Sequence, residues 1–280
     1  TNADIAEQTR AQRGSVSYTH PAASIDAPYD GAYAARGWPV DAALGRIDTA
    51  DVMGPGYAAS VRLWYRLLNC GFRFPATAGT DVFLNRVLSY PPGWGRAYVR
   101  LTNGLNYTDW IHGQQAGRTF VTTGPMLEFS AESREAGDTL RFDEPRSVRV
   151  QARAWSQYSL ANLEVVVNGQ AVLTNKPGGN PREITLDADV KLERTGWLAV
   201  RCTGAQSSNQ SGQNLDAHSS PIYIEIAGHP LEARADAEYF LKWIDRLDAD
   251  VTKRNRVPAG LRAVKMQLDA AREVYRKLTK

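Results

Sequence analysis

A histidine and an aspartate, His20 and Asp81, each follow directly after a short predicted strand. These strands are expected over residues 15–19 and 76–78, and catalytic groups of β/α barrels gather at the carboxyl ends of the strands. Imidazole and carboxylate are also common ligands of zinc and manganese. The two residues therefore predict a metal site. Two alternatives stay open, because a histidine before proline can be a loop residue and an aspartate after Gly-Thr can cap a helix.

Several other polar side chains are candidates for the same site. Asn85 follows the candidate aspartate closely enough to face its pocket, although solvation in a surface loop explains it as well. Arg118 could orient a substrate anion or form an ion pair at a domain junction. His218 could reach the same region or be a satisfied loop histidine. Asp48 and Asp51 flank a predicted strand, where they could support metal ligands or serve in turns and caps.

The first part of the chain, residues 1–117, has the pattern of a β/α layer structure, in which short apolar runs alternate with helical stretches. A strand is expected over residues 49–53 and helices over residues 57–68 and 107–116. The first of these helices is indicated by apolar residues at helical spacing: Val61, Trp64, Tyr65 and Leu68.

From residue 118 to residue 228 the pattern changes to short strands separated by turn residues, which is typical of a β-sandwich. In the stretch 147–155 the alternate residues Val148, Val150, Ala152 and Ala154 share one face. Asn168-Gly169 predicts a hairpin with a type I′ turn, because both residues tolerate positive φ angles. The Ser-, Gln- and Asn-rich stretch 204–214 predicts a loop.

Residues 229–280 predict two helices that form a hairpin. Apolar residues recur at spacings of three and four on both sides of Pro258, which gives each helix one apolar stripe. Burial of these stripes against the rest of the protein is the simpler interpretation, and a partner-binding coiled coil is the alternative.

Bulk properties exclude some classes of partner. The 33 basic and 30 acidic residues give a formal charge of only +3, without a basic run that would follow phosphates, so no nucleic-acid partner is expected. No apolar stretch approaches the roughly 20 residues that span a bilayer. The chain starts at Thr1 rather than methionine, so a targeting signal upstream would not be visible and an extracytoplasmic location stays open. Cys70 and Cys202 could be free thiols or one bridge.

Four runs of residues resemble a known family, the PHP (polymerase and histidinol phosphatase) superfamily of metallohydrolases, and within it the CehA/McbA or carbaryl-hydrolase-like type. The resemblance spans nearly the whole chain, and the second run is the most specific. The runs are SVSYTHP at 15–21, WYRLLNCGF continuing to PATAGTD at 64–81, AGRTFVTTGPML at 116–127 and SSPIY at 219–223.

The resemblance implies a fold and an activity. It implies a β/α barrel with a two- or three-metal site, here present as its carboxyl-terminal part, followed by an immunoglobulin-like sandwich. His20 and Asp81 would be metal ligands for zinc, manganese or iron. The implied reaction is hydrolysis of a phosphoester, carbamate, ester or amide bond of a small-molecule substrate by a metal-activated water.

Two departures from the family pattern concern the metal site. Many members carry a histidine two positions after the aspartate, where this chain has Phe83. The family pattern also begins with a His-x-His pair, which this sequence lacks. A catalytic zinc normally keeps three protein ligands, so we expect the chain alone to bind little metal and to have no hydrolase activity.

Two further expectations concern assembly and an alternative function. A partial barrel would leave an open sheet edge, which predicts a homodimer or pairing with a separately encoded first half. The alternative to an enzyme is a binding or scaffold protein whose sandwich recognises a glycan or a protein. Trp155 and Tyr158 could then form a stacking platform, whereas Trp197 is more typical of a core residue.

Overall fold

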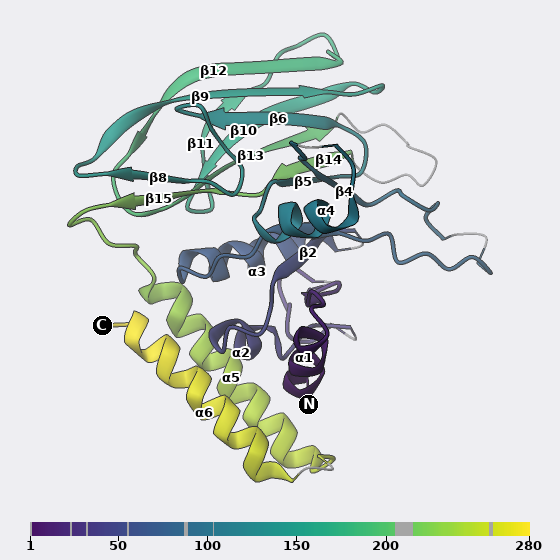
Figure 1. The fold of residues 1–280 in the computed structure, drawn as a ribbon, viewed down its shortest axis with the longest axis vertical. Helices are drawn as coiled ribbons and strands as arrows, with labels where there is room; N and C mark the ends of the chain where they lie inside the picture. The colour runs from purple at the N-terminus through teal and green to yellow at the C-terminus, as the bar shows by residue number, and fades with distance from the viewer. Residues whose placement is uncertain are drawn as a thin grey trace.

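The computed structural model describes residues 2–22, 24–31, 33–54, 56–86, 89–102, 104–204, 215–257 and 260–280. The fold is a mixed α/β arrangement dominated by sheets (Figure 1). Two stacked sheets form one end of the molecule, a small parallel sheet with its helices lies in the middle, and a pair of long helices forms the other end. No helix in the described ranges combines the length and apolarity that crossing a membrane requires. The predicted loop at 204–214 falls almost entirely outside the described residues.

The middle layer is a parallel sheet of three strands, with the order β1 (Ser17–Tyr18), β2 (Thr49–Met53) and β3 (Ala76–Ala78). All three agree with the predicted strands. Because the strands run parallel, their carboxyl ends lie at the same edge of the sheet. Within the described residues these strands form an open sheet rather than a closed barrel.

The predicted helix near residue 57 is confirmed as α3 (Tyr57–Asn69), and it contacts β2. Its apolar side chains are buried, and the indole N–H of Trp64 donates to the carbonyl oxygen of Phe74 at 2.8 Å. This hydrogen bond fixes the chain that leads from the helix into β3. Helix α4 (Tyr107–Gln115) is also confirmed, and the side chain of Asn106 caps its start by accepting from the backbone N–H of Asp109.

The sandwich consists of an eight-stranded and a four-stranded sheet, whose facing side chains share one core. The predicted alternation in β9 is confirmed, since Val148, Val150, Ala152 and Ala154 are all buried. The strands are β4 (Arg96–Val99), β5 (Thr119–Thr122), β6 (Met126–Ala131), β7 (Arg134–Glu135), β8 (Thr139–Phe142), β9 (Arg146–Trp155), β10 (Leu160–Val167), β11 (Gln170–Asn175), β12 (Glu183–Leu192), β13 (Gly196–Gly204), β14 (Asp216–Ser219) and β15 (Ile222–Ile226).

The strands β10 and β11 form the hairpin that Asn168-Gly169 predicts. Both turn residues have positive φ angles, 49° for Asn168 and 87° for Gly169, as a type I′ turn requires. The prediction from this dipeptide is therefore confirmed. Trp197 on β13 is 1% exposed, which confirms its reading as a core residue.

The C-terminal helical pair is confirmed as α5 (Arg234–Arg254) and α6 (Leu261–Leu278), which lie side by side (Figure 1). Their apolar stripes are buried in the same core as α3. Two polar atoms tie the pair to the segment around helix α2 (Trp38–Ala43): the indole N–H of Trp243 donates to Arg36 O at 2.9 Å, and the Tyr275 hydroxyl donates to Pro39 O at 2.8 Å. Burial against the protein accounts for both stripes.

Three elements do not follow from the sequence patterns. Helix α1 (Asn2–Ala11) buries only Ala3 and Ala6, so it has almost no apolar stripe, and α2 is too short for a periodic signal. Strand β4 precedes residue 117 but pairs antiparallel with β5, the first strand after it. This pairing joins two strands that lie on either side of α4 in the chain, so patterns among neighbouring residues do not predict it.

Side-chain hydroxyls join the parallel sheet to the sandwich at Ala76, the first residue of β3. The Ala76 N–H donates to Ser220 Oγ at 2.9 Å, and Thr119 Oγ1 donates to the Ala76 carbonyl at 3.0 Å. The two hydroxyl oxygens are 2.6 Å apart. Because the Thr119 hydroxyl donates its proton to the carbonyl, the Ser220 hydroxyl donates to Thr119 Oγ1. The three hydrogen bonds form a closed ring. All three residues are buried.

We predict that Ser220→Ala lowers the free energy of unfolding by about 1–3 kcal/mol, because it leaves the buried Ala76 N–H without an acceptor. Urea unfolding followed by circular dichroism measures this change. Ser147→Ala on the exposed face of β9 is the matched control, and its effect should stay within about 0.5 kcal/mol. Equal effects for the two variants would contradict the role given to the ring.

Candidate functional site

A small cavity of about 70 Å³ lies at the carboxyl ends of the three parallel strands, and we call it the strand-end cavity. His20 follows β1, Asp51 lies within β2 and Asp81 follows β3, and all three line the cavity. The structure thus brings together the two residues that the sequence predicts as metal ligands. Backbone and side-chain atoms of α3 and the strand ends complete the wall: Thr19, Val52, Met53, Gly54, Ser60 and Gly79.

Both predicted ligands have backbone conformations that are unusual for residues with side chains. The φ angle is 36° for His20 and 54° for Asp81, in the left-handed region. Such conformations cost free energy and persist where the surrounding structure enforces them, often at functional sites.

The imidazole of His20 is oriented by one hydrogen bond. Its Nδ1 lies 3.1 Å from the carbonyl oxygen of Tyr33, and the two rings meet edge to face with centroids 5.7 Å apart. Because a carbonyl only accepts, this contact places the proton on Nδ1 and leaves the lone pair on Nε2. Histidine ligands of metals are commonly oriented in this way.

Asp51 is the side chain whose importance the sequence understates. The pKa of Asp51 is raised to about 7, mainly because the carboxyl group is buried; a hydrogen bond from the Gly79 backbone opposes the rise and the neighbouring charge on Asp81 adds to it. A Cβ added at Gly79 would come within 3.1 Å of Asp51 Oδ2, so the glycine leaves room for the carboxylate. The available signal was an acidic residue inside an otherwise buried strand.

Asp48, which the sequence treats like Asp51, has a structural role. Its carboxylate pairs with Arg10 at 3.0 Å and accepts from the backbone N–H of Val16 at 2.8 Å. It lies outside the wall of the strand-end cavity. The two aspartates therefore differ because Asp48 lies before β2 and binds Arg10 and Val16, whereas Asp51 lies within β2 and lines the cavity.

The donors of the cavity suit a divalent cation in type but not in number. Imidazole and carboxylate are appropriate ligands for zinc, manganese or iron. Within the described residues, however, no group of three or more His, Cys, Asp or Glu side chains is arranged to hold an ion. Phe83, at the position where the family that the sequence resembles often has a histidine, is 45% exposed and stacks under the guanidinium of Arg86. This chain's described residues do not form a complete metal site.

The other predicted site residues lie elsewhere. Asn85 is exposed in a turn and does not line the strand-end cavity. Arg118 lines a separate groove on the sandwich. His218 on β14 is 0% exposed and belongs to the interior between α3 and the sandwich. The structure does not bring these three residues to His20 and Asp81.

His218 is held by two hydrogen bonds in an aromatic cluster. Its Nδ1 donates to the carbonyl of Ser219 at 2.7 Å, so its Nε2 accepts from the Tyr65 hydroxyl. The rings of Trp64 and Tyr65 pack against it. Burial lowers the pKa of His218 to about 3, with the opposing effect of the Ser219 hydrogen bond too small to offset it.

Comparison with known proteins adds little to this site. No protein-family model and no curated protein matches the chain. Among solved structures, a superoxide reductase (neelaredoxin) from Ignicoccus hospitalis aligns with 37% of this chain and 82% of its own chain, at 19% sequence identity and a TM-score of 0.20. A similarity at that TM-score carries no argument about fold or function.

The neutral, buried His218 predicts a pH-dependent stability. Its pKa is about 6.5 in the unfolded chain and lower in the folded protein, so below pH 6.5 protons bind the unfolded state preferentially and stability is lost as pH falls. His218→Gln removes this pH-dependent contribution to the free energy of unfolding. We expect the destabilisation caused by His218→Gln to be about 1.4 kcal/mol smaller at pH 5.5 than at pH 7.5.

Urea unfolding of both proteins at the two pH values measures this difference, in which the titration of shared carboxylates cancels. His112→Gln, which removes an exposed histidine on α4, is the matched control for loss of an imidazole outside the core. A destabilisation by His218→Gln that is equal at both pH values would contradict the assignment of a neutral histidine.

Proposed function

We propose that the strand-end cavity is part of the active site of a metal-dependent hydrolase, to which this chain contributes His20, Asp51 and Asp81. The observation that carries the proposal is the convergence of these three side chains at the ends of three adjacent parallel strands. Enzymes with β/α layers collect catalytic groups at this edge. The substrate class is a small molecule with a phosphoester, carbamate, ester or amide bond.

The proposal includes the finer fold. The open parallel sheet would be a segment of a PHP-like β/α barrel within residues 1–117, the two stacked sheets an immunoglobulin-like sandwich over residues 118–228, and residues 229–280 a helical appendage. Because the described donors do not complete a metal site, the proposal requires further donors from outside the described residues. An added strand pairing along β1 would bring such donors to the same edge.

Asp51 has a distinct part in this proposal. With a pKa of about 7, its carboxyl group exchanges a proton near neutral pH, which suits general acid–base chemistry. Its position on the central strand puts it between the strands that lead to His20 and Asp81. A divalent cation, when bound, would activate water and polarise a substrate oxygen.

We predict weak, saturable binding of Co²⁺ and Mn²⁺ by the chain, because few ligands are present. The binding free energy should fall well short of the roughly 10–16 kcal/mol of complete zinc sites. His20→Ala and Asp51→Asn should each weaken it further. Titration followed by the Co²⁺ absorption spectrum and by the Mn²⁺ electron paramagnetic resonance signal measures these affinities.

His112→Ala, which removes an exposed histidine outside the cavity, is the control and should bind as the wild type does. The absence of saturable binding, or binding that the cavity variants leave unchanged, would rule out the proposal. Stoichiometric metal retained through purification and lost in His20→Ala would instead show that the site is complete in this chain.

A further inference from the structure

A cleft of about 610 Å³ opens where the chain passes from the eight-stranded to the four-stranded sheet of the sandwich, and we call it the inter-sheet cleft. Thr123 and Gly124, which follow β5, and Met126, which starts β6, are part of its wall. A volume of this size is typical of ligand sites. None of the described residues lines both this cleft and the strand-end cavity, so the two sites are separate.

The wall of the inter-sheet cleft is mainly apolar and aromatic. It includes Trp155 and Tyr158, the two residues that the sequence predicts as a stacking platform, and Tyr158 is 42% exposed. Trp94 adds a third ring, which is held by stacking on Tyr90 with centroids 4.3 Å apart and an interplanar angle of 15°. Such rings favour a ligand that has a ring of its own. The remaining apolar residues of the wall are Pro91, Pro92, Met126 and Leu215.

Arg96 is the one charged residue among the described residues that line the inter-sheet cleft. Its partly exposed guanidinium donates to the carbonyl oxygen of Gly93 at 2.7 Å, and Gly93 also lines the cleft, so the positive charge lies at the wall. No ion pair involves Arg96 in the part of the chain that the structure describes. A guanidinium has five N–H groups, so the others remain available to an anion.

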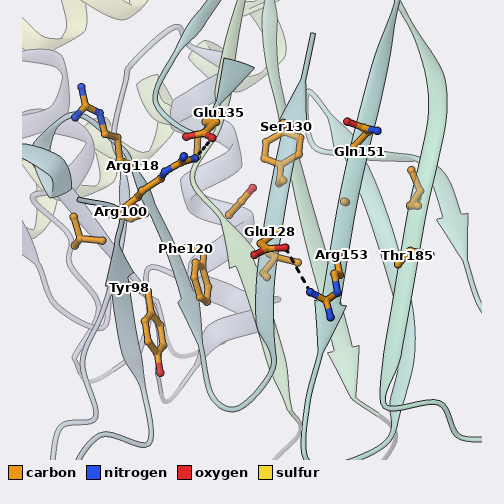
Figure 2. A pocket seen from close by; sticks show the side chains of 18 of the residues that line it. Tyr98, Arg100, Arg118, Phe120, Glu128, Ser130, Glu135, Gln151, Arg153 and Thr185 are labelled. Atoms are coloured by element: carbon orange, nitrogen blue, oxygen red, sulfur yellow. Dashed lines mark ion pairs between the residues drawn. The ribbon is translucent and has the colours of Figure 1, made fainter. Parts of the chain in front are cut away.

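The balance of charge distinguishes this cleft from a second groove, of about 730 Å³, that lies further along β4, β6 and β9 (Figure 2). Three arginines and three acidic residues line the second groove, so its charges cancel and do not select the charge of a ligand. The inter-sheet cleft has one positive and no negative charge among its described residues, which favours a monoanion. The charged residues of the second groove are Arg100, Arg118, Arg153, Glu128, Glu135 and Asp187.

The inter-sheet cleft has few polar groups to offer besides Arg96. The Thr123 hydroxyl accepts from the backbone N–H of Asp216 at 2.9 Å, and Ser156 Oγ accepts from the N–H of Tyr158 at 3.1 Å. Gln157 adds an amide. A sugar ring carries hydroxyl groups on most of its edge, and an apolar wall would leave several of them without partners, which costs free energy. An aromatic ring has no such requirement.

We propose that the inter-sheet cleft binds an aromatic monocarboxylate. Its ring lies among Trp94, Trp155 and Tyr158, and its carboxylate accepts hydrogen bonds from Arg96. The apolar wall buries the ring, and the guanidinium supplies charge-assisted hydrogen bonds, which are stronger than those between neutral groups. This inference does not rest on the proposed hydrolase function.

Isothermal titration calorimetry of the full chain with indole-3-acetate and indole-3-acetamide tests the proposal, because the two compounds share a ring and differ in charge. We expect the acid to bind and the amide to bind at least about tenfold more weakly, as for loss of a charge-assisted hydrogen bond. Arg96→Gln should abolish this preference. Trp155→Ala should weaken the binding of both compounds.

Arg262→Gln, which removes an exposed arginine on α6, is the matched control and should bind as the wild type does. Thermal unfolding of each variant separates a lost site from a lost fold, and the comparison of the two compounds on the wild type needs no variant. The proposal is overturned if indole-3-acetate does not bind at millimolar concentration or if the amide binds as tightly. It is also overturned if Arg96→Gln keeps the preference for the acid, or if octanoate or glucuronate binds more tightly than indole-3-acetate.

Discussion

The hydrogen-bonded ring around Ala76 is the constraint on which the arrangement of the two halves depends. An edge strand of a buried parallel sheet has backbone groups that must find partners, and here the hydroxyls of Ser220 and Thr119 supply them. Both hydroxyls come from the sandwich, and β3 leads directly to Asp81. The hydrogen bonds made by the N–H and carbonyl groups of Ala76 therefore set where the sandwich lies relative to the strand-end cavity.

Close packing around the parallel sheet explains how the strand-end cavity keeps features that cost free energy. Asp51 is partly desolvated, and His20 and Asp81 hold left-handed backbone conformations. Each of these costs free energy and would relax in a loosely packed structure. The core that spans α3, the parallel sheet and the helical pair resists such relaxation, because the large side chains of Trp64 and Tyr275 are fully buried in it. The helical pair thus contributes to the site indirectly, because it supports the sheet that positions His20, Asp51 and Asp81.

Local signals in the sequence account for most elements but not for their pairing. The apolar run of β2 and the Asn168-Gly169 turn are short-range patterns, and both appear in the structure where they are predicted. The pairing of β4 with β5 and the burial of His218 depend on residues far apart in the chain, which one sequence does not reveal. The convergence of His20 and Asp81 was predictable because parallel strands share an edge. The exclusion of Asn85 from the cavity was not, since it depends on the direction of a turn.

Strand β5 connects the strand-end cavity with a groove on the sandwich, because its side chains alternate between two faces. Successive side chains of a strand point to opposite faces, so the Thr119 hydroxyl reaches Ala76 on one face, while the side chains of Arg118 and Phe120 line a groove of about 730 Å³ on the other (Figure 2). Moving the register of β5 by one residue would exchange these faces. It would then break the ring and bury a guanidinium at the same time. The position of Arg118 in the groove therefore follows from the contact between Thr119 and β3. The groove and the strand-end cavity both depend on where β5 lies, although no residue lines both.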